Sequence, residues 1–191
     1  MPSSQAARVT VQKNLYRWCA LVKNMLIIVS GMAATGKTTF AKWLSQEICV
    51  PLLSLDELWD RLGTTNIPFA QYWILCEDIM KHSSPLIIEF GFWGEQNSII
   101  NELVEKYKYQ AINIHFCTSM ELAHRRFNDR RKYDMGGAKP QITLEQYAKI
   151  VEQSRDFQFG NCVIYIDTTD FSGVSYEDIT KQIQQYAVGA E

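Results

Sequence analysis

The glycine-rich stretch GMAATGKT, residues 31–38, has the residue types and spacing that most directly predict chemistry. It matches the pattern GxxxxGK[ST], with Gly31, Gly36, Lys37 and Thr38 at the fixed positions. Glycines permit tight turns in which backbone N–H groups converge on phosphate oxygens. The lysine can neutralise β- and γ-phosphate charge, and the threonine hydroxyl can bind Mg²⁺. The expected nucleotide contacts are Gly31, Ala33, Ala34, Thr35, Gly36, Lys37, Thr38 and Thr39.

The residues on both sides of this stretch have the pattern that a phosphate site requires. The apolar run MLIIVS, residues 25–30, predicts a buried strand, and a helical pattern runs from Lys37 to about Cys49. A helix in that position directs its positive end at the bound anion. The alternative, an accidental glycine-rich turn, would not require both neighbours.

The rest of the chain alternates short apolar runs with helical patterns. Strands are expected at 25–30, 50–55, 85–92, 111–117 and 162–167, and helices at 37–49, 68–82, 95–107, 118–131, 143–156 and 175–188. The segment DELWDRLG, residues 56–63, begins with a helical pattern that Gly63 can stop. Capping boxes are predicted at Thr118–Glu121 and Thr143–Gln146. This alternation indicates a three-layer α/β/α fold around a five-stranded parallel sheet. Ligands of such sheets bind beyond the carboxyl ends of the strands.

Two acidic residues stand where the second and third strands should end. Asp56 is expected to face the γ-phosphate, where it can orient an acceptor hydroxyl or take its proton; the alternative is a helix N-cap. Glu89 ends an apolar strand, an unfavourable place for a charge unless it meets a cation or ligand. We expect it to contact Mg²⁺-bound water or the acceptor; the alternative is a structural salt bridge.

The segment ELAHRRFNDRRKYDMGGAKP carries a cluster of arginines. Arg126 and Arg130 lie four residues apart on one predicted helix face, flanked by Arg125 and Arg131. Guanidinium groups can stabilise a transferring phosphoryl group. We therefore expect a lid over about 119–142 that closes and excludes water, with a solvated basic helix as the alternative.

Several classes of protein are disfavoured by what the sequence contains. The net charge of −2 gives no electrostatic reason to expect a nucleic-acid partner. The five scattered cysteines suit reduced thiols in a cytoplasmic protein, and neither a membrane span nor a secretory signal is expected. The guanine-reading NKxD segment of regulatory GTPases is absent, and one strand-end acid replaces the acidic pair typical of motor ATPases. These observations favour phosphoryl transfer.

Residues 1–24 are expected to form an N-terminal extension to a domain spanning 25–191. Val11, Leu15, Trp18 and Val22 recur at helical spacing, which predicts a helix packed on the domain or on a second subunit. A monomer or a homodimer fits this pattern. A second hypothesis makes the chain a nucleotide-binding or hydrolytic regulatory module that docks a partner through this helix.

The combination of GMAATGKTT, Asp56, Glu89, RRFNDRR and a last strand ending in IDTT resembles the P-loop small-molecule kinases over residues 25 to about 185. It is most similar to the zeta-toxin-like and chloramphenicol-phosphotransferase-like group, whose fold is like that of adenylate kinase. The resemblance implies ATP with Mg²⁺ as donor and a small-molecule hydroxyl as acceptor. It also implies that Asp56 is the base or acceptor anchor, that Arg126 and Arg130 are the lid arginines, and that Thr168 lies beside adenine.

Two positions depart from the resemblance. Ala34 stands where many relatives have glycine, and Trp59 stands where many have an arginine three residues after the acid. Because Trp59 replaces that arginine, the sequence gives less support for an acceptor that carries a phosphate or carboxylate group. The acceptor pocket is expected within 56–80 and 89–97, with Phe92 and Trp93 as lining residues for a sugar, an aminoglycoside-like compound or a nucleoside.

Overall fold

The computed structural model describes residues 23–62, 69–89, 91, 96–132, 139–160 and 162–189. Within these ranges five strands form one sheet in the order β2-β3-β1-β4-β5, and each pairing is parallel. The strands are β1 (Met25–Gly31), β2 (Leu52–Ser54), β3 (Leu86–Glu89), β4 (Gln110–Cys117) and β5 (Val163–Asp167). The predicted five-stranded parallel sheet is confirmed.

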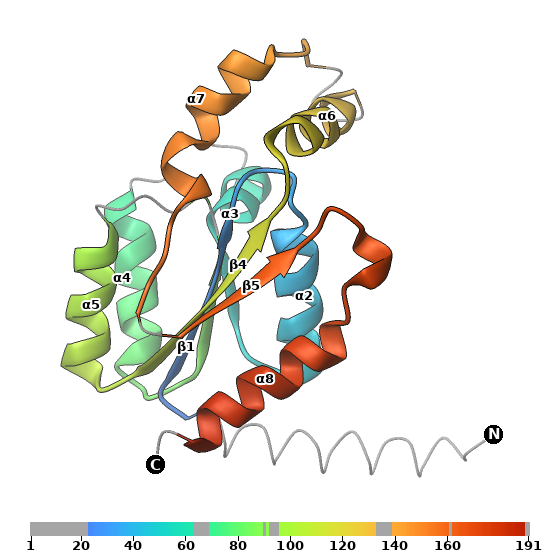
Figure 1. Ribbon diagram of the computed structural model, residues 1–191. Helices are drawn as coiled ribbons and strands as arrows, with labels where there is room; N and C mark the ends of the chain where they lie inside the picture. The colour runs from blue at the N-terminus through green and yellow to red at the C-terminus, as the bar shows by residue number, and fades with distance from the viewer. Residues whose placement is uncertain are drawn as a thin grey trace, which may run out of the picture.

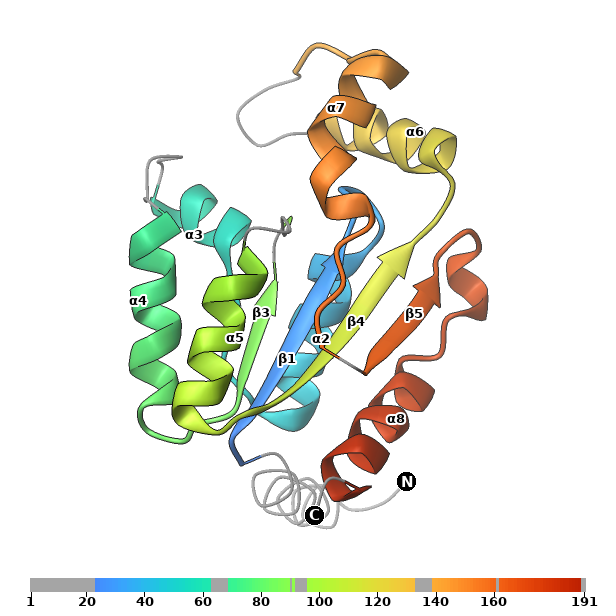
Figure 2. The same ribbon diagram turned by 60° about the vertical axis from the view of Figure 1, so that its left-hand side comes forward.

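Helices cover both faces of this sheet (Figures 1 and 2). One face carries α2 (Lys37–Ile48) and α8 (Tyr176–Gly189), and the other carries α4 (Phe69–Met80) and α5 (Gln96–Tyr107). The short α3 (Leu55–Leu62), α6 (Met120–Arg131), α7 (Leu144–Arg155) and the 3₁₀ turn η1 (Phe171–Gly173) lie toward the carboxyl ends of the strands. The three-layer architecture is therefore as predicted.

The central strand β1 is buried on both sides, which explains its unbroken apolar sequence. Met25, Ile27 and Val29 pack with α2 and α8, whereas Leu26 and Ile28 pack with α4 and α5. Side chains alternate between the two faces of a strand, so a strand covered on both faces needs apolar residues at every position.

We use the term lid helices for α6 and α7. The side chain of Asn128 in α6 ties the two together by binding the backbone just before α7. Asn128 donates from Nδ2 to the Ile142 carbonyl at 2.9 Å and accepts from the Ile142 N–H at 3.0 Å. Ala123, Tyr147 and Val151 of the lid helices then pack with Met32 of the phosphate loop, residues 31–38. The lid helices thus sit directly on that loop.

The two capping boxes predicted for the lid helices have different outcomes. Thr143 and Gln146 form the expected reciprocal pair at the start of α7. The box predicted at Thr118–Glu121 is wrong, because Ser119 is the N-cap of α6 and accepts from the Leu122 N–H at 3.2 Å. Thr118 instead hydrogen-bonds the Thr169 hydroxyl, so the neighbouring loop after β5 takes up its side chain.

Some predictions lie outside the described residues. These are the helix expected within 1–24, apart from residues 23 and 24, the aromatic pair Phe92 and Trp93, and the glycine pair at 136–137. Of the helices in the described ranges, none has the combined length and apolar character that crossing a membrane requires.

Gly31 lies tightly against the backbone of the neighbouring strand β4. Its φ is +129°, and a Cβ atom placed on it would lie 2.1 Å from the Phe116 carbonyl oxygen. A side chain here must displace backbone and adopt a conformation that L-residues avoid.

Gly31→Ala should therefore lower the free energy of unfolding by about 2 kcal/mol or more, measured by urea denaturation. Gly173→Ala is the matched control, since an added Cβ there has nothing within 4 Å, and its effect should stay within about 0.5 kcal/mol. Equal effects of the two substitutions would contradict the close approach at Gly31.

Candidate active site

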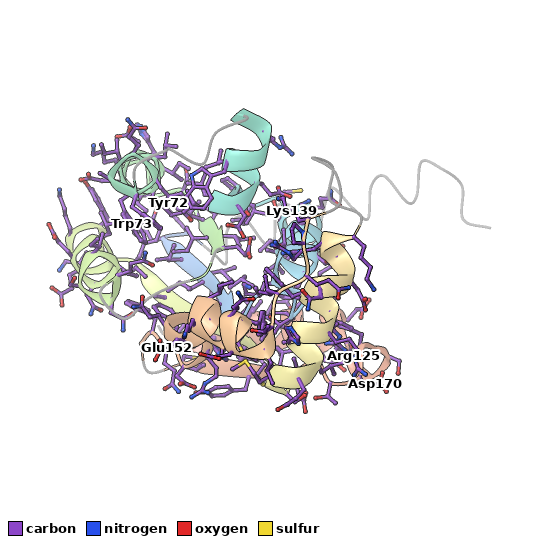
Figure 3. All side chains as sticks on the ribbon, turned by 90° about the horizontal axis from the view of Figure 1, so that it is seen from above. Tyr72, Trp73, Arg125, Lys139, Glu152 and Asp170 are labelled. Carbon is purple, nitrogen blue, oxygen red and sulfur yellow. The ribbon has the colours of Figure 1, made fainter. Side chains whose placement is uncertain are left out.

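The candidate site lies where the chain leaves β1 and β3 toward opposite faces of the sheet. β1 leads into α2 on one face, and β3 leads into α5 on the other. Adjacent parallel strands whose connections diverge leave a crevice beyond their carboxyl ends. A cavity of about 320 Å³ opens there, between the phosphate loop, α3 and the lid helices. Figure 3 looks down on this end of the molecule, with Tyr72 and Trp73 to one side and Arg125 and Asp170 to the other.

The phosphate loop turns through three residues with positive φ, which are Gly31 at +129°, Ala34 at +64° and Gly36 at +93°. The loop closes on itself, because the Thr35 hydroxyl and the Lys37 ammonium both donate to the Met32 carbonyl at 2.8 Å. Gly36 then leads into the first turn of α2, as an anion site at a helix N-terminus requires. The residues of the predicted set that line the cavity are Ala33, Ala34, Gly36, Lys37, Thr38 and Thr39.

The loop lysine is almost completely buried. Lys37 is 7% exposed, and its burial lowers the pKa of the ammonium group. The carboxylates of Glu89 and Asp56 act in the opposite direction on that pKa, and the Arg130 guanidinium lowers it further. The Lys37 ammonium thus interacts electrostatically with Glu89, Asp56 and Arg130, three of the charged residues that the sequence singled out.

Glu89 is held at the end of β3 with both carboxylate oxygens hydrogen-bonded. Its Oε1 accepts from the Thr38 hydroxyl at 3.2 Å, and its Oε2 accepts from the Ser54 hydroxyl at 2.7 Å. Glu89 is 1% exposed, and burial raises the pKa of its carboxyl while the Lys37 ammonium partly offsets this. Both hydrogen-bond partners of the Glu89 carboxylate are hydroxyl groups. A hydroxyl oxygen has lone pairs, so it can also bind a cation that approaches the carboxylate.

The chemistry of these donors fits Mg²⁺. A carboxylate and a threonine hydroxyl are hard oxygen ligands, and Mg²⁺ is commonly bound by one or two such groups together with substrate phosphates. The described residues contain no group of three His, Cys, Asp or Glu side chains that could enclose a metal. Thr38 and Glu89 thus suit an ion shared between protein and nucleotide rather than a metal cage.

Asp56 lies on the cavity with its side chain exposed. Because α3 begins at Leu55, Asp56 stands within the first turn of the helix, and the N-cap alternative is wrong. It lines the same cavity as Lys37 and Thr38. The adjacent acid Glu57 instead pairs with Lys42 of α2, outside the cavity lining.

The two lid arginines have different surroundings. Arg130 lines the cavity with its guanidinium 5.8 Å from the Phe127 ring centre. Arg126 is outside the lining and donates to the carbonyls of Thr168 at 2.8 Å and Thr169 at 3.2 Å. The structure thus brings Arg130 beside Lys37 and holds Arg126 against the loop after β5. Of the flanking pair, Arg125 is exposed and Arg131 donates to the Pro140 carbonyl.

Thr168 is fully buried, and its hydroxyl donates to the Cys117 carbonyl at 3.1 Å. Only its carbonyl group reaches toward the lid, where Arg126 binds it. The aromatic ring beside this loop is Phe171, which sequence reasoning missed. The guanidinium of Arg126 lies 4.3 Å from the Phe171 ring centre, and a Cβ on Gly36 would lie 2.7 Å from that ring. Phe171 therefore borders both the phosphate loop and the lid.

Tyr147 is the second residue that the sequence did not reveal. Its ring is buried in the lid, and its hydroxyl donates to the Ala33 carbonyl at 2.6 Å. It connects α7 to the phosphate loop across 114 residues of sequence, so no local pattern could have found it. Tyr72 and Trp73, by contrast, belong to α4 and are buried as core residues, as expected.

Solved structures of other proteins share the architecture of this chain. No protein-family model matches the chain. A candidate kinase from Chloroflexus aurantiacus superposes with a TM-score of 0.69 at 22% identity, over 88% of this chain and 98% of that one. The chain has the fold of a P-loop kinase. A gluconokinase from Sinorhizobium meliloti (TM-score 0.54, 13% identity, 88% and 94% covered) and the tunicamycin resistance protein of Deinococcus radiodurans (0.53, 17%, 87% and 96%) share it.

One curated relative is similar in sequence over part of the chain. A cytidylate kinase from Methanosphaera stadtmanae is 27% identical over 89 residues, which are 47% of this chain. The alignment spans 42% of that enzyme's length. The P-loop kinase fold confirms the architecture implied by the sequence resemblance.

Ala34→Gly should leave the protein as stable as the natural chain or stabilise it by up to about 1 kcal/mol. A left-handed alanine costs about 1–2 kcal/mol, and the greater freedom of glycine in the unfolded chain offsets about half of the gain. Ala41→Gly, in the buried middle of α2, is the control and should lose about 1 kcal/mol or more. Similar losses at both positions in thermal unfolding would contradict the strain at Ala34.

Glu89→Gln should become progressively more stabilising, relative to the natural protein, as pH rises from the ordinary glutamate pKa of about 4.3 through the raised pKa of the folded carboxyl. A carboxyl whose pKa is raised by folding stabilises the protein at low pH and loses that contribution as pH passes the folded value. The change amounts to about 1.4 kcal/mol for each unit by which folding raises the pKa. Denaturant unfolding at several pH values measures it.

Glu77→Gln gives a control of opposite sign. Hydrogen bonds from Lys106 and then Tyr107 lower the pKa of the Glu77 carboxyl. The natural residue therefore gains stability above its unfolded pKa, and the glutamine variant should fall behind as pH rises. The same pH trend in both variants would refute the assigned surroundings of Glu89.

Proposed function

We propose that this protein is an ATP-dependent kinase that transfers the γ-phosphate to a hydroxyl group of a small molecule, with Mg²⁺ as cofactor. The observation that carries the proposal is the meeting of the phosphate loop, Asp56 and Arg130 on one cavity, with Glu89 held beneath Thr38. A phosphate-binding loop, a carboxylate and a guanidinium are the groups that phosphoryl transfer to an alcohol requires.

The donor side of the reaction would use the phosphate loop. The N–H groups of the loop and of the first turn of α2 would bind the phosphate chain. Lys37 would exchange its bond to the Met32 carbonyl for β- and γ-phosphate oxygens. Thr38 and Glu89 would hold Mg²⁺, which when bound neutralises charge on those oxygens. The carbonyl of Thr168 together with Arg126 and Phe171 would border the adenine.

The acceptor side would use Asp56. The acceptor oxygen would form a bond to the γ-phosphorus while the bond from that phosphorus to the bridging β-oxygen breaks, which gives ADP and a phosphate ester. The acceptor proton would pass to the Asp56 carboxylate, or be oriented by it. Arg130 would stabilise the charge on the transferring group. The lid helices, which pack on the loop through Tyr147, would keep water away from it.

The similar proteins support phosphoryl transfer but differ in what they phosphorylate. The gluconokinase and the cytidylate kinase are both kinases of small molecules by name. A cytidylate kinase acts on a nucleotide phosphate, so the choice of a hydroxyl acceptor here depends on the site and on the exposed position of Asp56.

Asp56→Asn should lower the turnover rate for a confirmed acceptor by about 100-fold or more, the typical contribution of a general base, while ATP binding is retained. The acceptor is found first by incubating the protein with ATP, Mg²⁺ and a metabolite and antibiotic panel, and by identifying phosphorylated product by mass. Glu57→Gln is the control, because that neighbouring acid pairs with Lys42 outside the cavity lining.

Two results would count against this assignment. Full transfer by Asp56→Asn would remove the role of Asp56. ATP binding without any phosphorylated product would favour the regulatory-module hypothesis, in which deletion of residues 1–24 should abolish partner binding.

A further inference from the structure

The active-site cavity is lined by two kinds of residue. The polar lining includes the phosphate loop and Arg130. The apolar lining, which we name the apolar wall, consists of Leu55, Trp59 and Phe69 from α3 and α4 and of Ile150 and Val151 from α7. Asp56 lies between Leu55 and Trp59 in sequence, on the helix that carries part of the apolar wall. An acceptor whose hydroxyl meets Asp56 thus binds in a cavity that these apolar side chains also line.

Among the described residues of the cavity lining, no cation remains for the acceptor. The positive side chains there are Lys37 and Arg130, and the proposed reaction uses both on the donor phosphates. Of the segments outside the described residues, 63–68, 90, 92–95 and 133–138 contain no Lys or Arg, whereas 1–22 contains Arg8, Lys13 and Arg17. Arg61 of α3 borders a separate surface groove with Lys42 and Glu57. An acceptor carrying a carboxylate or phosphate would thus bury that charge without a partner and close to Asp56, which is strongly unfavourable.

The apolar wall offers contacts of another kind. Trp59 and Phe69 pack edge to face, with ring centres 6.2 Å apart and an interplanar angle of 85°. Ile150 lines the cavity and is 54% exposed. The indole Nε1 of Trp59 is buried and has no hydrogen-bond partner in the described part of the chain. The apolar wall thus offers apolar and aromatic surface to a ligand.

We infer that the acceptor is an uncharged alcohol with an apolar or aromatic face, which packs on Trp59, Phe69 and Ile150 and presents its hydroxyl to Asp56. This inference rests on the kinase function proposed above and narrows its substrate. Alcohols that already carry a phosphate or carboxylate group are poor acceptors, because the described lining residues have no cation left to pair with that group.

Two panels of acceptors, paired compound by compound, test the inference with the full-length protein. The first contains uncharged alcohols, namely nucleosides and 2-aryl ethanols, and the second contains the corresponding nucleoside 5′-monophosphates and 3-aryl lactates. ADP release and the mass of the phosphorylated product are measured with Mg²⁺ and ATP. We expect product from the uncharged panel. Its members should have a kcat/KM about tenfold or more above that of their charged partners, because a charged acceptor would lack one charge-assisted hydrogen bond, and the loss of such a bond has about this effect.

The outcomes separate this inference from the function on which it rests. Faster transfer to a hydroxyl of the anionic members, located by phosphorus NMR of the product, would refute the acceptor class and leave the kinase function standing. Transfer to their existing phosphate would refute both the acceptor class and the proposed hydroxyl acceptor. ATP hydrolysis or nucleotide binding with no product from either panel would overturn both.

A substitution in the apolar wall tests the physical cause. Trp59→Arg supplies the missing cation and should move the preference toward the anionic members by about tenfold or more. Trp59→Leu removes the indole without adding charge, so it should lower transfer to uncharged acceptors and leave the ratio between the panels on the uncharged side. Circular dichroism and ATP binding establish that both variants fold. An unchanged ratio in a folded Trp59→Arg protein would refute the role of charge.

Discussion

A buried carboxylate at the end of β3 is the constraint on which the rest of the site depends. Glu89 joins three elements, because it accepts from Thr38 at the start of α2 and from Ser54 at the end of β2 while it belongs to β3. The arrangement fixes the first turn of α2 against the sheet edge at which β1 and β3 diverge. Burial of a charge opposes folding, and the nearby Lys37 ammonium offsets only part of that cost. The site is therefore built around a group that the fold alone would not favour.

The lid helices depend on the same edge of the sheet through the phosphate loop. Tyr147 holds the Ala33 carbonyl, and Met32 packs into the small core between α6 and α7. Asn128 of α6 binds the Ile142 backbone, just before α7, with both of its amide atoms. A shift of the loop thus has to be accommodated by the lid. This coupling follows from hydrogen bonds and packing in the described part of the chain.

The sequence was sufficient to predict the sheet and the phosphate loop because both have strong local patterns. A strand buried on both faces reads as an apolar run, and the loop has fixed glycine positions. Ala34 was singled out as the irregular position of the loop, and its φ of +64° lies in the left-handed region that favours glycine. The boundary of α6 was predicted wrongly by one residue, because Thr118 and Ser119 are both good N-cap residues and only the contact with Thr169 decides between them.

Other parts of the site could not be predicted, because they depend on tertiary contacts. Helical spacing placed Arg126 and Arg130 on one face, yet the loop after β5 binds one of them and the cavity receives the other. Phe171 and Tyr147 reach the phosphate loop from distant segments. No periodicity or motif marks such residues, since their position is set by how the helices pack.

The bond between Lys37 and the Met32 carbonyl engages the ammonium group within the phosphate loop itself. Under the proposed function, a nucleotide would have to replace this contact, which spans 2.8 Å and is largely shielded from water, before it gains anything from the ammonium group. A ligand with a single phosphate would offer the lysine little in exchange, whereas a chain of β- and γ-phosphates would offer several anionic oxygens. The internal contact would therefore favour nucleotides with a longer phosphate chain before any acceptor is bound.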